Sequence, residues 1–81
     1  MDEQLVAFAE NAIRDYLAKR PDSADTIEGV HRWWIRWPDL AESPVVTQVA
    51  LERITASGEI ESVSIGNQII WRGSRRLSKT V

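Results

Sequence analysis

The sequence predicts an α+β domain in which three helices are followed by a two-stranded β-hairpin. Two observations lead to this prediction. Apolar residues recur at a helical spacing of three to four up to Ser57, and they alternate at a spacing of two after Gly58. Three residues that stop helices, Pro21, Pro38 and Gly58, divide the first part of the chain into three segments.

The first helix is predicted to begin after Asp2, whose carboxylate suits the N-cap position, and to end at Pro21. A short turn-rich connection is expected over residues 21–25. The apolar face of this helix is formed by residues at helical spacing, namely Leu5, Phe8, Ala9, Ala12, Ile13, Tyr16 and Leu17.

The second helix is predicted to run from Asp25 or Thr26 to Pro38, and it contains three of the four tryptophans. Ile27, Val30 and Trp34 share one helical face, which we expect to join the core. Trp33 and Trp37 are four residues apart and would form a second row beside that face. The sequence leaves open whether these two indoles are core or contact surface, with Trp33 the more readily placed in the core.

The third helix is predicted to begin at Ser43-Pro44, a capping hydroxyl followed by proline, and to run to about Ser57. Gly58 would supply the stop. Its spacing places Val46, Ala50, Leu51 and Ile54 inward and the following residues outward: Val45, Thr47, Gln48, Glu52 and Thr55.

Two strands, 60–65 and 68–72, are predicted on either side of Gly66-Asn67, a pair that suits a type II′ turn. We expect the face that carries Val63 and Ile70 to cover the helices. Such a turn places Ile65 opposite Gln68, Ser64 opposite Ile69, Val63 opposite Ile70 and Ser62 opposite Trp71. The domain would then cover residues 1–72, with a flexible basic tail over residues 73–81.

Composition limits the function classes. The 81-residue chain has no cysteine and a net charge of −2, so disulfides and thiolate metal sites are excluded. Residues 1–28 hold seven acids and three bases, whereas residues 29–81 hold seven bases and five acids. No apolar run approaches the roughly 18 residues that span a bilayer, and the acidic start does not resemble a signal peptide. We therefore expect a cytoplasmic protein that does not bind membranes.

A catalytic role is not expected. His31 is the only histidine, and no carboxylates accompany it at metal-ligand spacing, so we interpret it as a surface or boundary residue and expect no metal and no cofactor. The serines lack a nucleophile-elbow context, and the glycines occur singly rather than in a phosphate-binding loop.

The stretch SPVVTQVALERITASGEIE, which runs directly into SVSIGNQIIWR, resembles a winged helix-turn-helix domain. The resemblance covers residues 5–72. It implies that the helix over 43–57 is a recognition helix for the major groove and that the hairpin is a wing on the DNA backbone. The implied nucleic-acid contacts on that helix are Thr47, Gln48 and Arg53. A basic cluster next to the wing, formed by Arg72, Arg75, Arg76 and Lys79, would add phosphate contacts.

Two functions remain open. The first is a small, non-catalytic and regulatory protein-interaction module built on this scaffold. Its contact patch would combine arginines and indoles, as protein interfaces do, and it comprises Arg32, Trp33, Arg36, Trp37 and Trp71. The second is a sequence-specific DNA-binding regulator. The acidic balance, Glu52 on the recognition helix and the uncharged wing tip favour the first. A homodimer is compatible with either.

Overall fold

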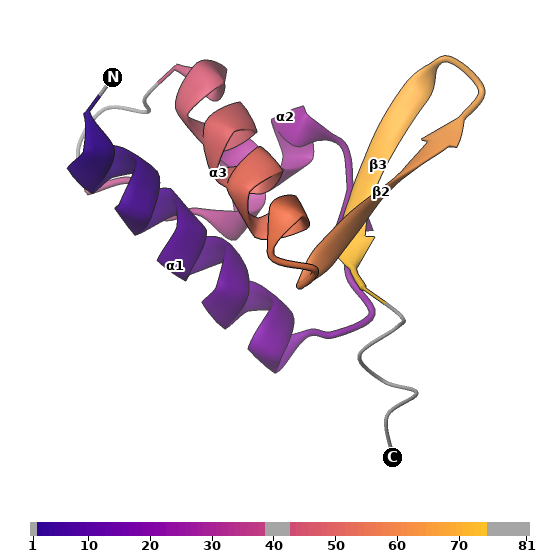
Figure 1. Ribbon diagram of the computed structural model, residues 1–81, viewed down its shortest axis with the longest axis horizontal. Coiled ribbons are helices and arrows are strands. Elements are labelled where there is room, and N and C mark those ends of the chain that lie inside the picture. Colours follow the sequence, from indigo (N-terminus) through magenta and orange to yellow (C-terminus); the bar gives the residue numbers. More distant parts are fainter. Residues whose placement is uncertain (1, 39–42, 75–81) are drawn as a thin grey trace.

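A computed structural model describes residues 2–38 and 43–74 of the chain. These residues form an α+β domain with three helical segments and a three-stranded antiparallel sheet (Figure 1). The helices lie on one side of the molecule, and the long β-hairpin stands beside them. Among the described residues, no helix has the length and apolar character required to span a bilayer.

Helix α1 (Glu3–Lys19) agrees with the prediction. The Asp2 carboxylate accepts a hydrogen bond from the Gln4 amide at 2.9 Å and so caps the first turn. The buried residues of α1 are spaced by three and four positions: Val6, Ala9 and Ile13. Phe8, which was expected on the core face, is 37% exposed.

Strand β1 (Ala24–Asp25) lies where the sequence predicted only a turn. It pairs antiparallel with β3, with Ala24 opposite Arg72 and Asp25 opposite Trp71. The sheet order is therefore β1-β3-β2, which makes β3 the central strand. Two residues are too few to show an alternating pattern, so this strand depends on a partner that is remote in sequence.

The second helix is shorter than predicted. It consists of α2 (Ile27–Gly29), capped by the Thr26 hydroxyl, and a π-helical turn, η1 (Val30–Trp34). The prediction that it reaches Pro38 is wrong, because Ile35 already has extended dihedral angles of φ −115° and ψ 126°. Ile35 is 2% exposed, and this extended backbone lets its branched side chain enter the core.

The indole of Trp37 supports the early end of this helix. Its Nε1–H donates a hydrogen bond to the His31 carbonyl at 3.0 Å. The last carbonyls of a helix have no partner within the helix and need one from elsewhere. Trp37 therefore closes the end of η1 from outside rather than lying on a helical row with Trp33.

Helix α3 (Pro44–Ala56) begins and ends as predicted. The Ser43 hydroxyl accepts from the Val45 amide at 3.2 Å, and Gly58 adopts a φ of +86° after the last turn. The predicted inward residues are all buried. The prediction that Thr47 points outward is wrong, since Thr47 is 0% exposed. It stands three and four positions before Ala50 and Leu51, which places it on the same buried face.

Strands β2 (Ile60–Ile65) and β3 (Gln68–Gly73) form the hairpin with the predicted register, from Ile65 opposite Gln68 to Ser62 opposite Trp71. Gly66 has a φ of +61°, and none of the described non-glycine residues, Asn67 included, has a positive φ, as a type II′ turn requires. β3 continues one residue beyond the predicted strand and predicted domain end. The basic residues Arg75, Arg76 and Lys79 lie outside the described residues.

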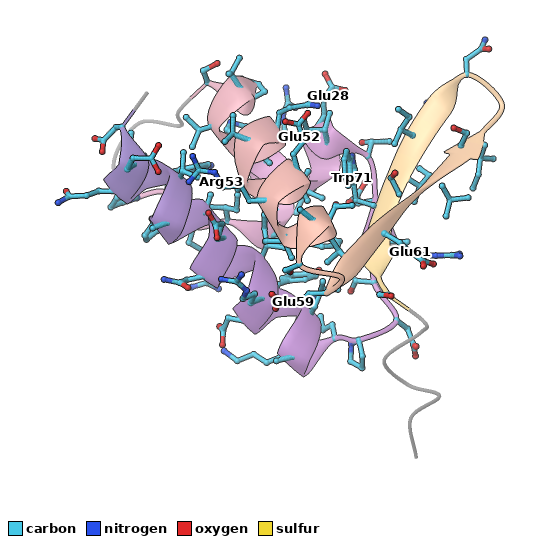
Figure 2. All side chains as sticks on the ribbon, viewed as in Figure 1. Glu28, Glu52, Arg53, Glu59, Glu61 and Trp71 are labelled. Atoms are coloured by element: carbon cyan, nitrogen blue, oxygen red, sulfur yellow. The ribbon has the colours of Figure 1, made fainter. Side chains whose placement is uncertain are left out.

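The choice of the covered hairpin face was wrong. Trp71 and Ile60 are buried at 8% and 3% exposure, so the face that carries Trp71 meets the helices, as Figure 2 shows. Val63 and Ile70 lie on the opposite face, together with a hydrogen bond of 2.7 Å from Arg72 to Glu61. An indole has much more apolar area to bury than a valine or an isoleucine, which explains the observed orientation.

Candidate functional site

The three clustered tryptophans have different environments. Trp34 is 5% exposed and belongs to the core, Trp37 is partly buried, and Trp33 is 73% exposed. The expectation that Trp33 would be the more buried of the uncertain pair is wrong. Because the helix ends at Trp34, Trp37 turns back toward Phe8, with ring centroids 5.8 Å apart, while Trp33 remains on the surface.

His31 is a core residue, and its interpretation as a surface or boundary residue was wrong. It is 6% exposed, and its Nδ1 lies 2.6 Å from the Thr47 hydroxyl oxygen. The Trp37 ring is 5.2 Å from the His31 ring, so histidine, threonine and tryptophan connect η1, α3 and the extended segment. Because the Thr47 hydroxyl is the hydrogen-bond partner of Nδ1, this histidine packs and hydrogen-bonds within the core.

Trp33 lies at a groove between α1 and the segment that follows η1, which we name the aromatic groove. It has a volume of about 560 Å³. Within it the Tyr16 and Trp34 rings stack at 4.8 Å with an angle of 10°. The guanidinium of Arg20 lies 5.4 Å from the centre of the Tyr16 ring. The residues that define this groove are Phe8, Tyr16, Arg20, Trp33, Trp34 and Arg36.

The charge of the aromatic groove is positive. Lys19, Arg20 and Arg36 line it, whereas Asp15 is the single acid and lies 3.2 Å from the Lys19 ammonium. No ion pair of Arg36 is found among the described residues. The groove thus combines an exposed indole, stacked rings and arginines, which are residue types enriched at protein interfaces.

The predicted contact patch is thus divided by the fold. Arg32, Trp33 and Arg36 are exposed, and Trp37 is held behind them by its bond to the backbone. Trp71 is buried and lines a second groove, between α2, α3 and β3, which we name the hairpin groove. The expectation that Trp71 lies on an open hairpin face is wrong.

The predicted nucleic-acid contacts that fall within the described residues are engaged within the protein. Thr47 is buried, and its hydroxyl lies 2.6 Å from His31 Nδ1, so its side chain is not on the surface of this structure. Gln48 is exposed and donates to Glu52 at 2.9 Å. Arg53 binds both carboxylate oxygens of Glu3 at 2.7 and 3.0 Å.

The ion pairs of α3 and β3 explain where their arginines point. Hydrogen bonding to Arg53 lowers the pKa of Glu3, and the same bond raises the pKa of Arg53. In Figure 2 Arg53 lies on the side of α3 that faces α1, away from the hairpin. Arg72 is bound to Glu61 on the outer face of the sheet. Neither arginine therefore adds positive charge to the hairpin groove.

The residues of α1 in the aromatic groove were not predicted as functional. Tyr16 belongs to the predicted apolar face of the first helix, and Arg20 is not among the predicted site residues. Their spacing of four residues was the available signal, since it places a cation beside an aromatic ring on one helical face. The position of Trp33 beside these residues could not be predicted from the sequence, because it depends on where η1 ends.

Within residues 2–38 and 43–74, no group of three or more histidine, aspartate or glutamate side chains could hold a metal ion. Comparisons with protein-family models, with curated proteins and with solved structures gave no match. The function of the chain must therefore be inferred from its own residues.

Proposed function

We propose that this chain is a small, non-catalytic and regulatory protein-interaction module, and that its aromatic groove binds an acidic segment of a partner protein with apolar side chains. The scaffold we propose is a winged helix, because the hairpin follows α3 directly and turns at Gly66-Asn67 as a wing does. The observation that carries the proposal is the 73% exposure of Trp33 at the edge of a cationic groove.

An exposed tryptophan leaves a large apolar area that a partner can bury with a gain in free energy. Tryptophan, tyrosine and arginine are the residues that contribute most often to binding energy at protein interfaces. All three line the aromatic groove, and the Tyr16–Trp34 stack gives it a rigid wall. A segment with carboxylates beside leucine or phenylalanine would match both the charge and the apolar surface.

DNA binding has less support from the described residues. On α3, the helix that would contact the DNA bases, Gln48 is bound to the carboxylate of Glu52, and Arg53 is bound to Glu3. Phosphate neutralisation supplies most non-specific affinity for DNA, and a carboxylate at the reading surface opposes it. The hairpin tip, at Gly66-Asn67, carries no charge.

The proposal is tested by titrating the protein with a short peptide in which glutamate alternates with leucine, and following tryptophan fluorescence. We expect saturable binding that weakens as salt is added, because the groove is cationic. The matched control peptide replaces glutamate by lysine and should leave this groove empty. Trp33→Ala should lower the affinity for the acidic peptide by about tenfold or more.

Two results would overturn the proposal. One is equal affinity of Trp33→Ala and the unchanged protein for the acidic peptide. The other is micromolar binding of random-sequence duplex DNA at low salt, with a steep loss on adding salt, which would favour the DNA-binding function.

A further inference from the structure

The hairpin groove is a second concave surface, with a volume of about 800 Å³, and it shares no lining residue with the aromatic groove. It lies between the first turns of α2 and α3 on one side and β3 on the other. Val45 on α3 and Ile69 on β3 both line it and are 54% and 53% exposed. Two large aliphatic side chains thus remain in contact with water in the same groove.

On the side away from β2, the part of β3 beside this groove has no neighbouring strand among the described residues. β1 pairs only with Trp71 and Arg72, so on that side residues 68–70 have no strand opposite them among the described residues. β3 therefore presents an open edge where β1 ends and the chain turns into α2. An open edge is a template for an added strand.

The hairpin register identifies which amide faces the open edge. In a two-residue hairpin the residues next to the turn, Ile65 and Gln68, form a hydrogen-bonded pair, and such pairs alternate along the ladder. Ile69, opposite Ser64, is then in a non-hydrogen-bonded pair. Its N–H and C=O consequently point away from β2, toward the side on which β1 binds Trp71.

The charge of the hairpin groove is negative, in contrast to that of the aromatic groove. Glu28 lines it, and Gln48, which also lines it, holds the Glu52 carboxylate at 2.9 Å. No lysine or arginine is among its lining residues. In Figure 2 both carboxylates lie above Trp71, on the upper part of the molecule.

We infer that the hairpin groove binds an extended segment of a partner protein in which basic residues alternate with β-branched apolar ones. The segment adds to β3 in line with β1 and exchanges backbone hydrogen bonds with Ile69. Its apolar side chains cover Val45 and the Ile69 side chain, and its lysines or arginines face Glu28 and Glu52. This site is independent of the aromatic groove, so the domain would bridge two segments of opposite charge.

The test is an NMR titration of the isotope-labelled protein with a short peptide in which lysine alternates with valine. We expect saturable shifts of the Ile69, Val45 and Gln48 amides, and none at Trp33. The Ile69 amide should exchange with solvent faster than the Ile70 amide in the free protein, and should slow when the peptide binds.

Matched variants separate the two grooves. The double substitution Glu28→Lys with Glu52→Lys should lower the affinity for the lysine–valine peptide by about tenfold or more, because the two introduced lysines would repel the lysines of the peptide. The corresponding glutamine double variant adds no positive charge and should give a smaller loss in the same direction. Trp33→Ala should leave the affinity for the lysine–valine peptide unchanged. Failure of the aromatic-groove proposal would therefore not alter the outcome of this test.

Several outcomes would overturn the inference. These are equal binding of a glutamate–valine peptide, unchanged binding of a lysine–valine peptide that is N-methylated at the amides facing β3, and shifts of the same amides on adding duplex DNA. Shifts of these amides with protein concentration alone would show instead that a second copy of the chain occupies the groove.

Discussion

Trp33 and Trp37 lie four residues apart, yet their replacement by alanine should affect stability very differently. Trp37 is partly buried against Phe8 and His31, and its indole N–H donates to the His31 carbonyl at 3.0 Å. Truncation removes these ring contacts and leaves the carbonyl at the end of η1 without its donor. Trp33 is 73% exposed, so alanine there removes little packing.

The magnitudes follow from these environments. Truncation of a fully buried tryptophan costs about 3–5 kcal/mol, so partial burial reduces the packing loss for Trp37→Ala to about 2 kcal/mol. The lost hydrogen bond adds about 1 kcal/mol. The total of about 3 kcal/mol corresponds to a fall in Tm of about 12–24 °C for a domain of this size. Trp33→Ala should cost about 0.5 kcal/mol or less, as surface substitutions usually do.

Thermal melts followed by circular dichroism compare the two variants directly. Trp37→Phe is the informative control, because it keeps an aromatic ring and removes the N–H, and it should cost about 1 kcal/mol. The reasoning fails if Trp33→Ala lowers the Tm as much as Trp37→Ala. It fails equally if Trp37→Ala has the same Tm as the unchanged protein, because the hydrogen bond to the His31 carbonyl would then contribute nothing to stability at the end of the helix.

Three further predictions concern the interior and the ion pairs. Thr47→Val keeps the shape but removes the hydroxyl that meets His31 at 2.6 Å, so denaturant unfolding should show a loss of about 1–3 kcal/mol, whereas Thr47→Ser should retain most of the stability. Gly29→Ala would place its Cβ on the Asp25 carboxylate, which would have to give up its bond to the next amide at 2.8 Å; we expect a cost of about 1 kcal/mol, and no added cost when Asp25→Ala is already present. Hydrogen bonds from Arg14, and then from Ser57, lower the pKa of Glu59. The contribution of Glu59 to stability is therefore present above the ordinary glutamate pKa of about 4.3 and is lost as the pH falls through the lower folded-state pKa. Unfolding measured across acidic pH should therefore be less pH-dependent in Glu59→Gln, by less than about 1 kcal/mol because the pair is solvent-exposed, and an unchanged pH profile would refute this.

Where the decisive interactions are local, the sequence predicted the structure well. Asp2 and Ser43 cap their helices through bonds to amides two residues away, and Gly58 and Gly66 adopt the positive φ that their positions require. The hairpin register follows from its two-residue turn alone. Each of these features depends on a few neighbouring residues, which a reading of the sequence can weigh directly.

Where a partner from elsewhere in the chain decides, the sequence was insufficient. β1 exists because β3 lies beside it, and the end of η1 depends on a hydrogen bond from Trp37. The hairpin face was ambiguous, since either side carries three apolar residues, and the burial of Trp71 decided between them. Thr47 was misplaced for a different reason. Its spacing matches the buried face, but a hydroxyl is buried only where it has a partner, and that partner, His31, lies on another element.

The same distinction applies to charge, and it determines what the surface can bind. The first 28 residues are the acidic part of the chain, yet α1 supplies Lys19 and Arg20 to the cationic groove. Asp15 is the single acid that lines this groove, and Glu3, at the other end of α1, is bound to Arg53 from the basic part. Conversely, most residues that line the hairpin groove follow position 28, yet the groove is bordered by the carboxylates of Glu28 and Glu52. No arginine lines it, because Arg53 points toward α1 and Arg72 is bound to Glu61 on the outer face. Ion pairs between distant elements thus remove charges from the surface selectively. The sign of each groove is set by the charges that remain unpaired around it, and a count of charges along the sequence does not give this.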